Sequence, residues 1–256
     1  MSRQVVLVTG ASTGIGRACA DHLNGFDYRV YAASRSSEFR LDVTEQSSVD
    51  SAIRTILASE GRLDVLVNNA GIAIAGPLET TPLEEAHRQF EVNFFGALRV
   101  IRAALPAMRA QGSGYIVNIG SIGGLIAIPY QSLYSASKFA LEGLTESLRL
   151  ETRHFGIRCV LIEPGDHRTS ITQNRTVVPA PAPYAESFQR ALAQIPADEQ
   201  NGPAPEAVAR LVHRVITTRH PRLRYTTGPF PQRAAVWLKR LFPYALLEYG
   251  MRKYYS

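Results

Sequence analysis

Tyr134 and Lys138 are the side chains of this sequence whose types and spacing best suit proton transfer. Lys138 is the only lysine in the first 238 residues, although the chain has 28 basic side chains. Positions i and i+4 of a helix lie on one face, so the ammonium is expected near the phenol. A nearby positive charge favours phenolate and lowers the pKa of a tyrosine. The pair therefore predicts a general acid/base, although the same spacing also occurs in solvated surface pairs.

A glycine-rich segment near the start of the chain predicts a phosphate-binding turn. An apolar run of strand type is followed by Thr9-Gly10-Ala11-Ser12-Thr13-Gly14-Ile15-Gly16, and a helical segment comes next. Glycine allows a tight turn and lets a ligand approach the backbone closely. The free N–H groups at the start of the helix favour a phosphate. Between a strand and a helix, this Gly-x-x-x-Gly-x-Gly spacing indicates a dinucleotide-binding site.

The order of elements along the chain indicates a sheet that could position these residues. Apolar, strand-like runs lie at residues 5–9, 29–33, 40–43, 63–68, 114–119 and 158–163. Helical spacing covers residues 15–23, 47–60, 83–108 with a break at 93–96, 134–154 and 205–217. Strands that are nearly all apolar and alternate with helices predict an α/β fold, with a parallel sheet covered on both faces.

Two segments of the C-terminal third depart from this alternation of strands and helices. Residues 176–205 contain six of the 15 prolines, which is typical of a lid or a loose insertion, so we expect a substrate lid at about 170–205. Residues 230–256 mix bulky apolar side chains with Lys and Arg. This C-terminal extension could cap the substrate pocket, pack on a partner subunit or lie on a membrane surface. Because Pro243 and Gly250 interrupt it, packing or capping is favoured over peripheral membrane contact.

Composition argues against several other classes of protein. Hydrophobic residues make up 45% and charged residues 20% of the chain, as in soluble globular proteins. No run is long enough for a transmembrane segment and no signal peptide is recognisable, so a cytoplasmic protein is expected. The two cysteines and six histidines lack ligand spacing, so no metal site is predicted. The net charge of +6 arises in residues 206–256, which contain ten Lys/Arg and only two Glu. No nucleic-acid-binding module is recognisable there.

Several motifs together make the chain resemble the short-chain dehydrogenase/reductase family, in its hydroxysteroid and retinol dehydrogenase-like branch. The similarity runs over about residues 4–175 and keeps the order Thr9-Gly10-x-x-x-Gly14-x-Gly16, Asp42, Asn68-Asn69-Ala70-Gly71, Asn93, Ser121, Tyr134-x-x-x-Lys138 and Pro164-Gly165. These residues fall at the carboxyl ends of predicted strands, where such sheets bind ligands. The resemblance implies a single doubly wound Rossmann-type catalytic domain over residues 1–256, with a seven-stranded parallel sheet and helices on both faces. Residues 222–225 would form the seventh strand.

The resemblance also implies four catalytic residues. Tyr134 is the expected general acid/base, which gives a proton to a carbonyl oxygen in reduction and takes the alcohol proton in oxidation. Lys138 is expected to lower the Tyr134 pKa and to hydrogen-bond the nicotinamide ribose. Ser121 is expected to orient the substrate oxygen. Asn93 is expected to hold a helix break open and to anchor a water that connects Lys138 to solvent.

A nicotinamide cofactor follows from the same resemblance. Its expected contacts are Gly10, Ser12, Thr13, Gly14, Ile15, Gly16, Ser34, Arg35, Asp42, Val43, Asn69, Ala70, Gly71, Tyr134, Lys138, Pro164, Gly165, His167 and Thr169. Asp42 and Val43 would meet the adenine, and Thr169 with the backbone near His167 would meet the carboxamide. Position 167 departs from the aliphatic residue expected there. Asn68 is expected to have the structural role of linking strands.

The end of the second strand favours NADP(H) over NAD(H). Ser34 stands where NAD-dependent members usually carry Asp, and Arg35 can face a 2′-phosphate with a bidentate fork. Because the segment up to Asp42 is short, Arg40 could lie nearby and assist Arg35. Thr13 argues in the other direction, since many NADP-dependent members carry a basic residue at that position.

Apolar side chains in the 122–131 loop and the predicted lid favour a lipophilic substrate. The first hypothesis is an NADP(H)-dependent oxidoreductase that interconverts a lipophilic carbonyl and a secondary alcohol, such as a steroid or retinoid. The first alternative is a 3-oxoacyl-thioester reductase, whose acidic carrier protein could meet the basic tail. The second is a non-catalytic nucleotide sensor. By resemblance, helices around residues 92–110 and 134–153 form the subunit contact, so a homodimer or homotetramer is expected.

Overall fold

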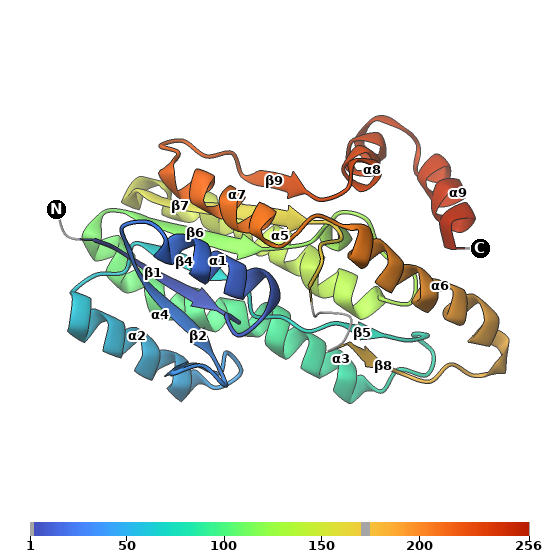
Figure 1. Cartoon of the computed structure of the whole chain (residues 1–256), viewed down its shortest axis with the longest axis horizontal. Helices are drawn as coiled ribbons and strands as arrows, with labels where there is room; N and C mark the ends of the chain where they lie inside the picture. Colours follow the sequence, from blue (N-terminus) through green and yellow to red (C-terminus); the bar gives the residue numbers. More distant parts are fainter. Residues whose placement is uncertain (1–2, 170–174, 256) are drawn as a thin grey trace.

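Runs of branched apolar residues form a seven-stranded parallel sheet in the computed structural model, which describes residues 3–169 and 175–255 (Figure 1). The strand order is β3-β2-β1-β4-β6-β7-β9, and every pairing is parallel. The strands are β1 (Gln4–Thr9), β2 (Tyr28–Ser34), β3 (Phe39–Arg40), β4 (Val65–Asn68), β6 (Gly114–Ile119), β7 (Ile157–Pro164) and β9 (Arg224–Thr227). The predicted α/β class with a seven-stranded parallel sheet is confirmed.

Helices cover both faces of the sheet because successive strand residues point to opposite sides. In β1, Val5 and Leu7 belong to one core cluster, whereas Val6 and Val8 belong to the other. The first face is covered by α2 (Gln46–Glu60), α4 (Ala97–Gln111) and α5 (Ser132–Thr152). The second face is covered by α1 (Gly14–Asn24) and α7 (Glu206–Thr217). This two-sided covering is the doubly wound arrangement that the sequence predicts.

The long helical segment at residues 83–108 is interrupted where the sequence predicts a break. It consists of α3 (Leu83–Phe90), a π-helical stretch η1 (Glu91–Gly96) and α4. π-helical turns insert one residue into a helix and frequently occur at functional sites. Asn93 lies within this stretch and is buried, so the interruption fixes the position of one predicted site residue.

The third strand is shorter than predicted. The sequence pattern suggests residues 40–43, whereas β3 consists of Phe39–Arg40. Leu41 still donates its N–H to the Ser34 carbonyl oxygen, but the N–H of Asp42 donates to the Ser48 hydroxyl instead of to a strand. The strand therefore ends because the backbone of Asp42 binds the start of the next helix.

The Pro-rich segment is more regular than a loose insertion. Thr176–Val177 forms β8, which pairs with β5 (Ile74–Ala75), and residues Ala182–Asn201 form the helix α6. Pro183 falls in the first turn of α6, where its missing N–H has no helical partner in any case. Residues 170–174 of the predicted lid lie outside the described residues.

The predicted C-terminal extension forms two helices, α8 (Phe230–Leu241) and α9 (Tyr244–Tyr255). In Figure 1 they lie at one end of the molecule, beyond the sheet, and α9 packs against α6 and α8. A short helix η2 (Ile122–Gly124) after β6 contacts α8, and η3 (Arg153–Phe155) follows α5. In the described part of the chain, no helix is both long and apolar enough to span a membrane.

Candidate active site

Glycine permits the tight turn between β1 and α1. Gly10 and Gly14 adopt the left-handed region, with φ of 64° and 56°. At Gly16 a Cβ atom would lie 2.3 Å from the Gly10 carbonyl oxygen and 2.4 Å from Nδ2 of Asn69, which is closer than real side chains approach. The helix α1 begins without a side-chain cap. Its first N–H groups are therefore oriented toward a site that fits a phosphate, as expected for a dinucleotide.

Asn69 and Thr9 hold this turn against the end of β4. The side-chain amide of Asn69 donates to the carbonyl oxygens of Thr9 and Gly10, both at 3.1 Å. The Thr9 hydroxyl accepts from the backbone N–H groups of Asn69 and Ala70 at 3.0 and 3.1 Å. Thr9 and the predicted cofactor residue Asn69 therefore position the glycine turn through hydrogen bonds within the protein.

The structure places the remaining predicted cofactor residues in different surroundings. A cavity of about 860 Å³ is lined by Ile15, Asn69, Gly71, Tyr134, Lys138, Pro164, Gly165, His167 and Thr169, among others. Ser12 and Thr13 are exposed at the start of α1. Val43 is buried with its side chain against Gly96, so it can offer only its backbone to an adenine.

Ser34, Arg35 and Asp42 form the surface at the end of β2. The Ser34 hydroxyl accepts from two backbone N–H groups of the following turn, at 3.2 and 2.9 Å. Arg35 and Arg40 are both exposed. Burial acts to raise the pKa of Asp42, but hydrogen bonds from Thr44 and the charges of Arg35 and Arg40 outweigh burial and lower it. Both arginines therefore lie close enough to Asp42 to act on its charge, as the short segment between β2 and Asp42 suggests.

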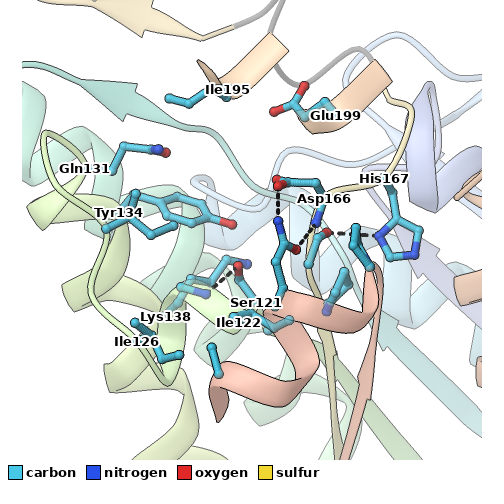
Figure 2. Close-up of a pocket in the computed structure, with 18 of the residues that line it drawn as sticks. Ser121, Ile122, Ile126, Gln131, Tyr134, Lys138, Asp166, His167, Ile195 and Glu199 are labelled. Atoms are coloured by element: carbon cyan, nitrogen blue, oxygen red, sulfur yellow. Dashed lines mark hydrogen bonds between the residues drawn. The ribbon is translucent and has the colours of Figure 1, made fainter. Parts of the chain in front are cut away.

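Ser121, Tyr134 and Lys138 come together in the cavity (Figure 2). Tyr134 and Lys138 lie one turn apart on α5, and Ser121 follows β6. The Lys138 ammonium lies 5.9 Å from the centre of the Tyr134 ring and donates to the Ile119 carbonyl oxygen at 2.9 Å. The Ser121 hydroxyl accepts from the N–H of Gly123 at 2.9 Å and is hydrogen-bonded to Tyr134. The predicted proximity of these three side chains is present.

Burial dominates the electrostatics of the pair on α5. It raises the pKa of the Tyr134 phenol, and the hydrogen bond with Ser121 and the charge of Arg175 oppose this rise. Burial lowers the pKa of Lys138 to about 8, and the charge of Glu142 opposes the change. The phenol is therefore protonated at neutral pH. The sequence predicts a lowered Tyr134 pKa, but burial raises it.

Asn93 supports this arrangement from the π-helical stretch. Its Oδ1 accepts from the N–H of Ile72 at 2.9 Å, and its Nδ2 donates to the Ile72 carbonyl oxygen at 3.1 Å. The same amide group donates to the Ser137 hydroxyl at 3.1 Å, which in turn donates to the Tyr134 carbonyl oxygen at 2.7 Å. Asn93 therefore connects the loop after β4 to the turn of α5 that carries Tyr134.

Polar side chains line the cavity beside the Tyr134 phenol. Arg175 and Glu199, whose side chains are 6% and 9% exposed, form an ion pair at 3.1 Å. Gln232 accepts from the N–H of Asp166 at 2.9 Å and donates to its carboxylate. The charges of Arg175, Asp166 and Glu199 all act on the pKa of Tyr134. In Figure 2 the phenol oxygen is directed toward the side of the cavity where Asp166 and Glu199 lie.

Apolar side chains form the rest of the cavity wall. They come from η2 and the following loop, from α6, and from the two C-terminal helices: Ile122, Ile126, Ile128, Ile195, Ala235, Leu238, Phe242, Leu246 and Met251. Val236 of α8 is buried against Ile122 and Ile126. The C-terminal extension is therefore part of the wall of this cavity.

Comparison with known proteins identifies the family to which the chain belongs. A family model described as short chain dehydrogenase matches residues 37–177, which is more than half of the chain. The chain belongs to the short-chain dehydrogenase/reductase family. It is accordingly an oxidoreductase of the class that acts on CH–OH groups.

Two curated relatives of this short-chain dehydrogenase cover most of its length. The 3-ketodihydrosphingosine reductase of Bacteroides thetaiotaomicron is 39% identical and covers 100% of this chain and 99% of that protein. Human 17-beta-hydroxysteroid dehydrogenase type 1 is 34% identical and covers 89% of this chain and 78% of that protein. The second relative agrees with the hydroxysteroid-like branch that the sequence suggests.

Solved structures agree with the same assignment. A short-chain dehydrogenase from Streptomyces avermitilis superposes with a TM-score of 0.85 at 34% identity, over 94% of this chain and 93% of that one. A short-chain dehydrogenase/reductase from Burkholderia phymatum in complex with NAD has a TM-score of 0.80 at 26% identity, over 93% of each chain.

Sequence reasoning missed the polar side of the cavity in this short-chain dehydrogenase. Arg175 and Glu199 are 24 residues apart, and Asp166 meets Gln232 across 66 residues. No local pattern marks such pairs, because each side chain belongs to a different element. His167 is a departure from the family pattern that the sequence did reveal. It is buried, its Nδ1 lies 2.9 Å from the Gly165 carbonyl oxygen, and burial lowers its pKa despite that hydrogen bond.

Proposed function

We propose that this short-chain dehydrogenase is an NADP(H)-dependent oxidoreductase that interconverts a lipophilic ketone and its secondary alcohol. The observation that carries the proposal is the shared cavity. Ser121, Tyr134 and Lys138 lie together at its polar end, and apolar side chains of η2, α8 and α9 line the remainder. A proton donor inside a largely apolar wall suits a substrate whose carbonyl is attached to a bulky hydrocarbon.

The proposed chemistry assigns a step to each of these side chains. A bound nicotinamide supplies the hydride. The Tyr134 O–H donates its proton to the carbonyl oxygen, which becomes the hydroxyl of the product. When the ketone binds, the Ser121 hydroxyl exchanges its hydrogen bond with Tyr134 for one that it donates to the same carbonyl oxygen, and it thereby orients the ketone. The raised pKa of Tyr134 keeps the phenol protonated before the substrate binds, which suits the reducing direction.

Lys138 and Asn93 have supporting roles in this proposal. We propose that the Lys138 ammonium stabilises negative charge on Tyr134 and hydrogen-bonds the nicotinamide ribose. With a pKa of about 8, Lys138 is mostly protonated at neutral pH, so it can fill both roles. Asn93 fixes the turn of α5 that carries Tyr134, and we propose that it also anchors a water between Lys138 and solvent.

The glycine turn and the end of β2 support a nicotinamide cofactor, with NADP(H) preferred over NAD(H). A related structure holds NAD, and the turn after β1 fits the phosphates of either cofactor. Arg35 and Arg40 are exposed at the place where a 2′-phosphate would lie. Replacement Arg35→Ala should weaken NADPH binding by about tenfold or more and leave NADH binding nearly unchanged. Equal losses for both cofactors, measured by fluorescence titration, would argue against this preference.

The polar side of the cavity supports an amphiphilic substrate with a polar group close to the carbonyl. Arg175, Asp166 and Glu199 all act electrostatically on the Tyr134 phenol, so they lie beside the proposed position of the carbonyl. The apolar wall continues away from them toward α9. Long-chain 3-ketodihydrosphingosine has this distribution of groups, and a relative that is 39% identical is named as its reductase.

A panel of ketones with NADPH as the reductant tests the proposal. The panel contains 3-ketodihydrosphingosine, a long-chain 3-ketone without the polar head, a steroid ketone, retinal and an acetoacetyl thioester. We expect turnover of the lipophilic ketones and a preference for the amphiphile. The Tyr134→Phe protein keeps the buried ring, and it should lose about 10²–10⁴-fold in kcat/KM while it still binds NADPH.

Three outcomes would contradict parts of the proposal. Undiminished turnover by Tyr134→Phe would remove Tyr134 as the proton donor. Selective turnover of the thioester would favour a 3-oxoacyl-thioester reductase. NADPH binding without turnover of any ketone would favour a nucleotide sensor.

A further inference from the structure

In the described part of the chain, exposed large hydrophobic side chains are concentrated in the C-terminal segment. Of the fifteen large hydrophobic side chains that are exposed, eight lie within residues 230–249. Phe230, Leu241 and Tyr249 are 78%, 74% and 69% exposed. The other seven are distributed over the rest of the described residues. Because exposed apolar patches normally mark a place where a protein meets another molecule or a membrane, this concentration of exposed side chains indicates such a place.

These side chains are additional to the ones that attach the helices to the protein. Val236 of α8 is buried against Ile122 and Ile126, and Met251 of α9 packs against the same cluster. The Lys239 ammonium donates to the carbonyl oxygen of Leu125. Parts of α8 and α9 are therefore occupied by contacts within the protein. The exposed apolar side chains of residues 230–249 lie outside these contacts, and we call the surface that they form the α8–α9 face.

The charge of this segment indicates what the α8–α9 face meets. Residues 230–256 contain five Lys/Arg and one Glu, so their formal net charge is +4. Lys239 is bound to the Leu125 carbonyl oxygen and Arg252 pairs with Glu248, but the segment as a whole keeps its net positive charge. A second copy of the chain in a symmetric contact would bring two such positively charged segments together, which is unfavourable. Bulky apolar side chains interspersed with basic residues are instead typical of helices that lie in the surface of a membrane. Each basic residue near anionic lipid contributes about 1 kcal/mol to such binding.

Solvent reaches the part of the cavity wall that the C-terminal helices form. Leu238, Phe242 and Leu246 line the cavity and are also 49%, 50% and 58% exposed. We infer that these three side chains form the rim of the cavity. An apolar molecule dissolved in a bilayer in contact with this rim could therefore enter the cavity without crossing water.

We propose that the α8–α9 face docks on an anionic phospholipid surface and takes its lipophilic ligand directly from the bilayer. The apolar side chains insert at the boundary between headgroups and acyl chains, while the basic side chains contact the phosphates. Membrane binding stands on the exposed surface and its charge, independently of the proposed function. Uptake of a ligand from the bilayer does rest on that function.

Flotation of the full-length protein with vesicles tests the docking without any measurement of turnover. We expect binding to vesicles that contain phosphatidylglycerol, weaker binding to pure phosphatidylcholine, and partial release by high salt. Leu241→Ser should weaken the partition coefficient by about tenfold, because one inserted leucine is lost. Leu83→Ser on α3 is the matched control, since Leu83 is 72% and Leu241 74% exposed. It should leave the partition coefficient unchanged.

The same experiment can overturn the proposal. Equal effects of Leu241→Ser and Leu83→Ser, or equal binding to charged and uncharged vesicles, would exclude the α8–α9 face as an anionic-membrane surface. A wild-type protein that does not float, but forms an oligomer that Leu241→Ser dissociates in light scattering, would show that a second copy covers this face. Membrane binding with no ketone turnover would leave the docking intact and count against the proposed function alone.

Discussion

Around the glycine turn, polar side chains are bound by protein groups, whereas along α8 and α9 large apolar side chains face outward. Thr9 and Asn69 fix the backbone through four hydrogen bonds. In contrast, Trp237 and Leu241 are 61% and 74% exposed. The difference indicates that the two regions have different functions. The sheet edge is organised in advance for a cofactor of fixed shape, and the C-terminal helices offer a surface on which varied apolar molecules can be accommodated.

The largest expected effect comes from placing a methyl group in the glycine turn. A Cβ atom at Gly16 would overlap the Gly10 carbonyl oxygen, so Gly16→Ala should cost about 3 kcal/mol of unfolding free energy. Gly143→Ala on α5 is the control, because a Cβ atom there meets nothing within 4 Å. It should stabilise the protein by about 0.5–1 kcal/mol. Urea denaturation measures both, and similar values for the two variants would contradict the rigid turn.

A pH series should reveal the buried charge of Lys138. Its pKa is lowered by burial from 10.5 to about 8. Between these values the unfolded chain binds more protons than the folded one, so the unfolding free energy should rise with pH. Relative to Lys138→Met, the rise should approach about 3 kcal/mol from pH 8 to 10.5. A constant difference between the two proteins over this range would mean that Lys138 is not desolvated.

A smaller loss is expected where only hydrogen bonds are removed. Thr9→Val keeps the shape of the side chain but deprives the N–H groups of Asn69 and Ala70 of their acceptor. It should destabilise the protein by about 2 kcal/mol in urea denaturation. Thr55→Val on the exposed surface of α2 should change the unfolding free energy by less than about 0.5 kcal/mol. If Thr9→Val changed the unfolding free energy as little as Thr55→Val, the glycine turn would not depend on the Thr9 hydroxyl.

The smallest effect on stability is expected on the C-terminal side. Phe242 is half exposed and lines the cavity, so Phe242→Ala should cost less than about 1 kcal/mol of unfolding free energy. Its effect should appear instead in a raised KM for a lipophilic ketone, with kcat little changed. A large loss of unfolding free energy would mean that Phe242 stabilises the fold as the residues of the glycine turn do.

The sequence predicted best what depends on short spacings. Gly10, Gly14 and Gly16 are required by backbone geometry within one turn, and the four-residue spacing of Tyr134 and Lys138 places both on one side of α5. The break at residues 93–96 was predicted from the sequence pattern and is present as the π-helical stretch Glu91–Gly96. The nearly continuous apolar runs predicted the sheet for the same reason, since strands buried on both faces must be apolar throughout.

What the sequence could not predict depends on contacts between distant segments. The pairing of Arg175 with Glu199 requires α6 to fold back over the cavity, and the prolines near its start suggested a loop. The exposure of Leu241 likewise depends on which side of α8 packs against η2. Composition showed that this segment is basic and apolar, but only the arrangement of the helices shows which side chains remain outside.

The π-helical stretch at Glu91–Gly96 also makes the length of this segment as important as its composition. A π-helical turn contains one residue more than an α-helical turn. Deletion of Phe95, which is 44% exposed, would permit an uninterrupted α-helix and would rotate everything before it by about 100° relative to α4. Asn93 would then turn away from Ile72 and Ser137, although every residue that touches the cavity would still be encoded. A substitution at Phe95 should therefore be tolerated where the loss of a single codon is not.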